Sequence, residues 1–123
     1  MTDIKLMFTS SESDASQEDL GYSMRTLIGD PDAEADAAMF LRNSPLLRAA
    51  ELKQPLLMAH GAADLRVPLA HASRFRDAVK AHNPNVTSII YNDEGHGWRN
   101  EQTNIAFWQQ VETFLDKNLK HAQ

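Results

Sequence analysis

Two side chains suited to proton transfer, Asp64 and His96, follow two predicted strands in this chain of 123 residues. Asp64 lies in the turn that Gly61 begins, and His96 stands between Gly95 and Gly97. Imidazole shuttles protons at neutral pH, and the flanking glycines leave its ring free to project from the backbone. Open α/β sheets place their chemistry at the carboxyl ends of their strands, which favours an acid–base pair here. The simpler interpretation is a turn aspartate and a solvated loop histidine.

The second half of the chain has the pattern of a strand–helix–strand–helix unit. Residues 56–59 form a short apolar run bounded by proline and glycine, which is typical of a strand buried on both faces. Pro68 suits the first position of a helix over residues 68–82, and residues 86–91 are rich in β-branched side chains, as strands are. A last helix is predicted over residues 101–120. This order predicts a parallel pair of strands with a helical crossover.

The last predicted helix carries apolar residues at helical spacing, which we expect to form its buried face. They are Ile105, Trp108, Val111, Leu115 and Leu119. Four aromatic side chains in and before this helix are likewise predicted to be core residues: Trp98, Phe107, Trp108 and Phe114.

The first half of the chain, residues 1–54, is predicted to be a mainly helical lead-in to residues 55–123. Residues 2–8 are only loosely periodic and are interpreted as the end of a strand or the start of a loop. Residues 9–16 are rich in serine and acidic side chains, as exposed loops are. Three helices are expected after them, at about residues 17–28, residues 33–41 and residues 46–52. No repeat or linker divides the chain, so we expect a single domain.

The composition limits the classes of function. A hydrophobic fraction of 42% and a charged fraction of 24% are ordinary for a globular domain. The formal charge of −5, with no basic cluster, argues against nucleic acid as a partner. No run approaches the roughly 20 apolar residues of a membrane helix, so no membrane partner is expected. Because the sequence carries no secretory signal, a cytoplasmic location is the default expectation.

The sequence predicts no cofactor and no metal. Five histidines share no ligand spacing with one another: His60, His71, His82, His96 and His121. His60 ends a buried strand and is expected to be a packed side chain. The turn around His96 lacks the third glycine and the strand-to-helix setting of a phosphate-binding loop.

The two loops together are similar to the C-terminal part of the catalytic domain in the prolyl oligopeptidase family of serine peptidases. The matching residues are His60-Gly61, Asp64 and Val67-Pro68, followed by Glu94-Gly95-His96-Gly97. The resemblance covers residues 43–120 well. It implies the C-terminal portion of an α/β-hydrolase fold, with a short parallel sheet flanked by helices in one partial domain over residues 1–123. It also implies that Asp64 is the acid and His96 the general base of a catalytic triad, with a peptide as the substrate of the complete enzyme.

The nucleophile of that triad has no counterpart here. The family places its serine in a Gly-x-Ser-x-Gly elbow between a strand and a helix, and this pentapeptide does not occur in the sequence. Ser23 follows Gly21 and has half of the pattern, but it lies within a predicted amphipathic helix. Ser10, Ser11 and Ser13 are interpreted as loop hydroxyls. We therefore expect the tail of a hydrolase domain that is inactive alone.

Two further interpretations stay open at this point. The chain could belong to another α/β-hydrolase, such as an esterase, or be a non-catalytic interaction module derived from one. In either case the strand at residues 56–59 should have one unpaired side, because residues 86–91 supply one neighbour and no second strand is predicted. An open apolar edge pairs readily with another chain. We therefore expect a homo-oligomer, formed through that edge or by a swapped segment.

Overall fold

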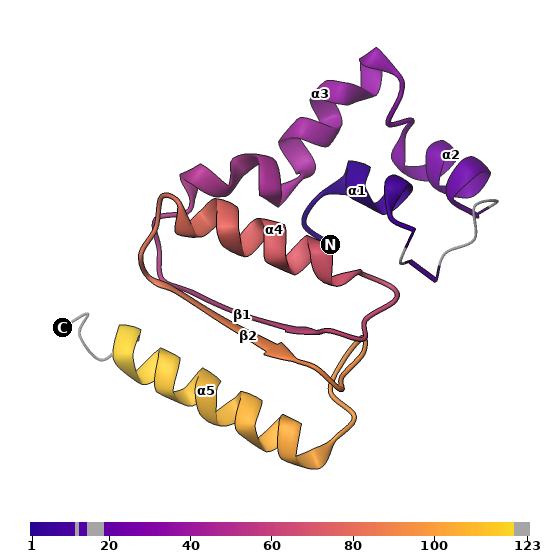
Figure 1. Ribbon diagram of the computed structural model, residues 1–123. Coiled ribbons are helices and arrows are strands. Elements are labelled where there is room, and N and C mark those ends of the chain that lie inside the picture. Colours follow the sequence, from indigo (N-terminus) through magenta and orange to yellow (C-terminus); the bar gives the residue numbers. More distant parts are fainter. Residues whose placement is uncertain (12, 15–18, 120–123) are drawn as a thin grey trace.

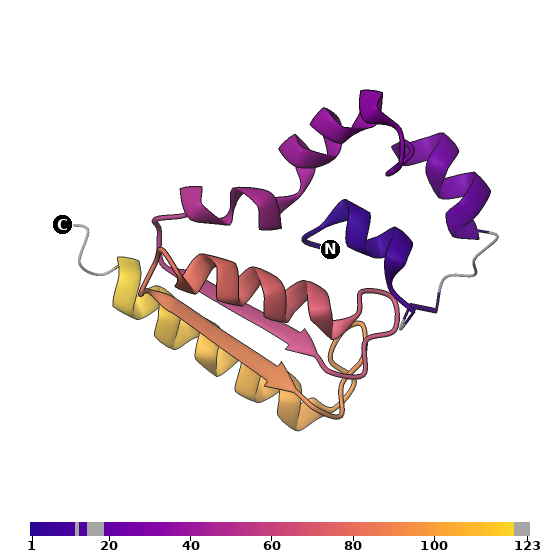
Figure 2. The same ribbon diagram turned by 45° about the horizontal axis from the view of Figure 1, so that its top comes forward.

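The computed structural model describes residues 1–11, 13–14 and 19–119, and in these a two-stranded parallel sheet lies between helices. Strand β1 (Leu56–Gly61) leads through helix α4 (Leu69–Lys80) to strand β2 (Val86–Tyr91), and helix α5 (Glu101–Leu119) follows. Figures 1 and 2 show α4 against one face of the sheet and α5 against the other. The predicted short parallel sheet flanked by helices is confirmed.

The two strands run in register along their whole length. Leu56 stands opposite Val86 at one end, and Gly61 stands opposite Tyr91 at the other. Both strands therefore finish level, and the loops that follow them emerge at the same edge of the sheet (Figure 1). Strand β1 continues through His60 and Gly61, two residues beyond the predicted apolar run. This extension matters because it carries the start of the Asp64 loop to the end of the sheet.

In its described residues the lead-in consists of short helices and turns, and it packs beyond α4 (Figure 1). Its elements are α1 (Ile4–Thr9), the π-helix η1 (Asp19–Met24), α2 (Arg25–Ile28), α3 (Glu34–Asn43) and the 3₁₀-helix η2 (Pro45–Glu51). The helix predicted at about residues 17–28 is thus a π turn followed by one α turn, and residues 17 and 18 lie outside the described residues. Gly29, with φ of 118°, ends α2 in a conformation that favours glycine.

Residues 2–8 differ from both interpretations of the sequence, because Ile4–Thr9 form helix α1. The carboxylate of Asp3 caps it by accepting hydrogen bonds from the backbone N–H groups of Lys5 and Leu6 at 3.0 and 3.4 Å. The buried Ser44 Oγ accepts a further bond from Ile4 N–H at 3.0 Å. The loose apolar periodicity of these residues does not predict a helix. Its first turn is stabilised instead by the Asp3 cap and by the hydroxyl of the distant Ser44.

The apolar face predicted for α5 is largely wrong. Ile105, Leu115 and Leu119 are exposed, and Trp108 is 63% exposed. Of these five predicted residues only Val111 is half-buried, and the helix turns it inwards together with Phe107 and Phe114. The core predictions for Phe107 and Phe114 therefore hold better than the one for Trp108. Two apolar stripes run along this helix, and the sheet covers only one of them.

The described residues leave one side of β1 without a strand partner. The predicted unpaired edge is present, and α1 does not supply a strand to close it. The most deeply buried apolar side chains lie on α4 and in the lead-in, and include Val79, Ala72, Ala49 and Phe40. In the described part of the chain, no helix combines the length and apolar character needed to cross a membrane.

Candidate functional site

The backbones of the two strand-end loops touch, and Gly61 makes this contact possible. A Cβ on Gly61 would lie 2.3 Å from the carbonyl oxygens of both Glu94 and Gly95. Two hydrogen bonds then join the loops, from Ala62 N–H to Tyr91 O at 2.9 Å and from Ala63 N–H to Glu94 O at 3.0 Å. The contact and the two hydrogen bonds thus join the loops into one edge. A side chain at Gly61 would force the loops apart.

Asp64 is held in place by its own turn. Its side chain is buried, with 6% of the residue exposed. Oδ1 accepts hydrogen bonds from the backbone N–H groups of Arg66 and Val67, both at 2.9 Å. Such local side-chain-to-backbone bonds are typical of aspartate in turns. They leave the second oxygen, Oδ2, directed to the neighbouring loop.

His96 binds that second oxygen. The distance from His96 Nδ1 to Asp64 Oδ2 is 2.9 Å. Burial alone would raise the pKa of Asp64, but hydrogen bonds from Val67 N–H, His96 and Arg66 N–H outweigh it, and the pKa is lowered. The carboxylate is therefore ionised at neutral pH and accepts the bond, so Nδ1 carries the hydrogen. This tautomer leaves Nε2 of the neutral ring free to accept a proton.

The loop that carries His96 is anchored by a buried carboxylate on one side and by aromatic rings on the other. Glu94 Oε2 accepts a hydrogen bond from Arg99 N–H at 2.8 Å, and Oε1 accepts one from Asn100 N–H at 3.1 Å. The Arg99 N–H is the main cause of the lowered pKa of Glu94, and these bonds outweigh the opposing effect of burial. Glu94 therefore fixes the start of α5 relative to the histidine.

Aromatic packing fixes the other side of the loop. The ring of Trp98 packs against Tyr91 at the end of β2 and against Phe107 on α5, with centroid separations of 4.9 and 5.6 Å. Between these anchors, Gly97 adopts φ of 113°, which a side chain would disfavour. His96 itself remains accessible, with 54% of its side chain exposed. The histidine thus projects from a loop that is fixed on both sides.

The structure places the remaining candidates as follows. Ser23 lies exposed in the π-helix η1 of the lead-in. His71 is buried on α4, and burial is the main cause of its lowered pKa. His121 lies outside the described residues. Among the residues that the structure describes, no group of three or more histidine or acidic side chains forms a potential metal site.

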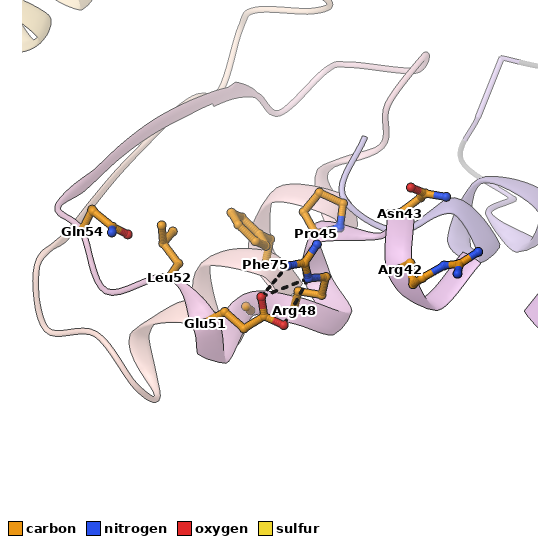
Figure 3. Close-up of a pocket in the computed structure, with 9 residues that line it drawn as sticks. Arg42, Asn43, Pro45, Arg48, Glu51, Leu52, Gln54 and Phe75 are labelled. Carbon is orange, nitrogen blue, oxygen red and sulfur yellow. Dashed lines mark hydrogen bonds and ion pairs between the residues drawn. The ribbon is translucent and has the colours of Figure 1, made fainter. Parts of the chain in front are cut away.

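A separate pocket of about 490 Å³ lies where α3, η2 and α4 meet, and neither Asp64 nor His96 lines it (Figure 3). Its lining includes Phe75, Leu52 and Arg48. The Arg48 guanidinium is already bound to Glu51, at 2.6 Å between Nη2 and Oε2. This pocket therefore offers no acid–base chemistry to match that of the two loops.

Several known proteins are similar to this chain in sequence. The model of the prolyl oligopeptidase family matches residues 6–122. Dipeptidyl aminopeptidase BIII of Pseudoxanthomonas mexicana is 40% identical over 88 residues, which cover 72% of this chain and 13% of that protein. Dipeptidyl peptidase family member 6 of Caenorhabditis elegans is 37% identical over 76 residues, or 62% of this chain and 10% of that protein.

The structure is also similar to a solved one. The uncomplexed acylaminoacyl peptidase of Pyrococcus horikoshii matches with a TM-score of 0.80 at 22% identity, and the match covers all of this chain and 20% of that one. This likeness shows the α/β-hydrolase fold. The chain therefore spans about a tenth to a fifth of the length of these relatives.

Proposed function

The chain belongs to the prolyl oligopeptidase family, and from this premise we propose that Asp64 and His96 are the acid and the general base of a serine-peptidase triad. The observation that carries the proposal is the 2.9 Å contact between Asp64 Oδ2 and His96 Nδ1, at the level ends of two parallel strands. The acid binds Nδ1–H and so presents Nε2 as the base.

The chemistry follows from this tautomer. Nε2 takes the proton of a serine hydroxyl as the serine oxygen attacks the peptide carbonyl, and the imidazolium then gives that proton to the leaving amine. Asp64 stabilises the imidazolium through its negative charge, which its hydrogen-bonded turn maintains. A water molecule then attacks the acyl-serine by the same steps, with Nε2 taking its proton and returning it to the serine oxygen, and the acyl group is released. We propose a peptide as the substrate of the complete enzyme, in keeping with the relatives.

We further propose that the serine is not supplied by this chain. The sequence contains no Gly-x-Ser-x-Gly elbow, and Ser23, its nearest imitation, lies in a π-helix rather than at a strand end. The oxyanion hole, which partly depends on the residue after the nucleophile, is then absent as well. The chain alone should therefore not hydrolyse peptides or esters through a serine.

A fluorophosphonate probe, which reacts with activated serines, tests this proposal directly. The chain should remain unlabelled, and a Ser23→Ala variant serves as a matched control. Stoichiometric labelling that disappears in Ser23→Ala would show that the chain does carry its own nucleophile. In a longer polypeptide that joins this sequence to a Gly-x-Ser-x-Gly segment, preference for peptide anilides over acyl esters would separate the peptidase from the esterase alternative.

We also propose that the chain alone forms homo-oligomers. The open side of β1 presents backbone groups without a strand partner in the described residues, and its side chains are apolar, including Leu56, Leu57 and Met58. Two such edges can pair with each other. Light scattering at micromolar concentration should give a mass above 13.8 kDa. A single species at the monomer mass would contradict the proposal.

A further inference from the structure

His60 lies at the end of β1, next to the acid but outside the triad proposed above. Its side chain is only 15% exposed. The ring atom Nε2 lies 2.8 Å from the backbone carbonyl oxygen of Val67, across the turn that contains Asp64. Because a carbonyl oxygen can only accept a hydrogen bond, Nε2 must carry the hydrogen. The contact therefore defines the tautomer of this histidine.

Val67 connects this histidine to the acid. While its carbonyl accepts from His60, its N–H donates to Asp64 Oδ1 at 2.9 Å. Helix α4 does not compete for that carbonyl in its first turn, where His71 N–H bonds to Pro68 O at 2.9 Å. His60 thus holds the carbonyl group of Val67, and the N–H group of the same residue holds the acid.

A continuous series of hydrogen bonds therefore runs between two imidazoles. It passes from His60 to the carbonyl of Val67, from Val67 N–H to Asp64 Oδ1, and from Asp64 Oδ2 to Nδ1 of His96. The His60 ring also stands close to the carboxylate itself, with 3.8 Å between its Nε2 and Asp64 Oδ2.

We propose that His60 is a positioning residue for the acid: its Nε2–H fixes Val67, and through Val67 it fixes the carboxylate that orients His96. The proposal rests on the proposed function, since it assigns a role in presenting the same base. If His60 only filled space, an apolar residue of similar size could replace it without effect on the acid. The series of bonds requires a donor at this position.

The test compares three substitutions in the full chain. His60→Phe and His60→Leu remove the donor, whereas His60→Gln keeps an N–H donor at a comparable reach. Two NMR signals are followed: the Asp64 carboxyl carbon through a pH titration, and the His96 Nδ1–H proton. In the Phe and Leu variants the pKa of Asp64 should rise towards its ordinary value, and the Nδ1–H signal should be lost to exchange. His60→Gln should retain both properties.

Controls separate this effect from general destabilisation. Val79→Ala, which removes a fully buried side chain on α4, should lower stability and leave both signals unchanged. Unchanged signals in the Phe and Leu variants, or equal changes in His60→Gln, would overturn the proposal. If those variants do not fold, the ¹⁵N shifts of the unsubstituted chain still decide, because a His60 that carries its proton on Nδ1 cannot make the bond.

Asp64→Ala, which removes both acceptor oxygens, distinguishes this inference from the proposed function. If that substitution leaves the His96 Nδ1–H signal unchanged, the acid–base pair itself is absent and the proposed function fails. If the signal is lost in Asp64→Ala but retained in His60→Phe, the pair exists and only the role of His60 is wrong.

Discussion

The loops that carry Asp64 and His96 follow adjacent strands, yet the two side chains differ in burial and in their number of hydrogen bonds. Asp64 is 6% exposed and accepts hydrogen bonds from two backbone N–H groups and one imidazole. The side chain of His96 is 54% exposed, and its bond to Asp64 orients it. Asp64 is therefore part of the packed structure, and His96 is accessible to a reacting partner. This division suits the proposed triad, in which the base must meet a serine and a substrate.

The glycines of the two loops also differ, in how much space each has for a side chain. A Cβ at Gly61 would collide with the backbone of the other loop at 2.3 Å, whereas one at Gly95 would meet Ala63 O at an ordinary 3.7 Å. Gly61 is thus required by the contact between the loops. Gly95 is not required by any such contact.

The largest effect is expected from Gly61→Ala. The new methyl group collides with backbone atoms that cannot rotate away, so the free energy of unfolding should fall by about 3 kcal/mol. Urea denaturation measures the change. Gly95→Ala is the matched control and should cost less than about 1 kcal/mol. Equal losses for the two variants would show that the contact at Gly61 does not hold the loops together.

Asp64→Asn should have an intermediate effect. The amide replaces one acceptor oxygen by a donor, so at least one of the three hydrogen bonds is lost, at a cost of about 1–3 kcal/mol at pH 7. Because the pKa of Asp64 is lowered in the folded state, the ionised carboxylate stabilises the fold above the ordinary pKa. This contribution is lost as the pH falls through the lowered pKa.

The pH dependence gives a second measurement on the same pair of proteins. The difference in unfolding free energy between the unsubstituted chain and Asp64→Asn should shrink between about pH 5 and pH 2. Urea midpoints over this range provide the test. A difference that stays constant with pH would mean that the charge of Asp64 contributes nothing to folding.

The smallest effect on stability is expected from His96→Ala, within about 0.5 kcal/mol, since the side chain is exposed. The effect of the same substitution on catalysis should, in contrast, be large. In a longer polypeptide that supplies the serine, peptidase kcat/KM should fall by about 10⁴-fold or more. Stability and rate are measured on the same variant. A large loss of stability would place His96 with Asp64 as a structural residue and remove the contrast between the loops.

Much of the site was predictable from the sequence. Proline before an apolar run and glycine after it located β1 and placed Asp64 just beyond its end. The β-branched run located β2, and the histidine between two glycines followed it. The hydrogen bond from His60 to Val67 was not predictable, because the sequence pattern is equally consistent with a histidine that only packs at the end of a strand. Its role depends on where the turn returns the Val67 carbonyl, which no local pattern specifies.

The sequence alone determined which residues could do chemistry and that two parallel strands would bring them to one edge. Only the tertiary structure decided which surface is covered. Helix α5 carries one apolar stripe through Phe107, Val111 and Phe114, and another that includes Trp108 and Leu115, which are exposed. Periodicity detects both stripes equally. Which stripe is covered depends on how α5 is oriented relative to β2. Trp98, which lies between them in the chain, packs against Tyr91 of β2 and Phe107 of α5 and so fixes this orientation.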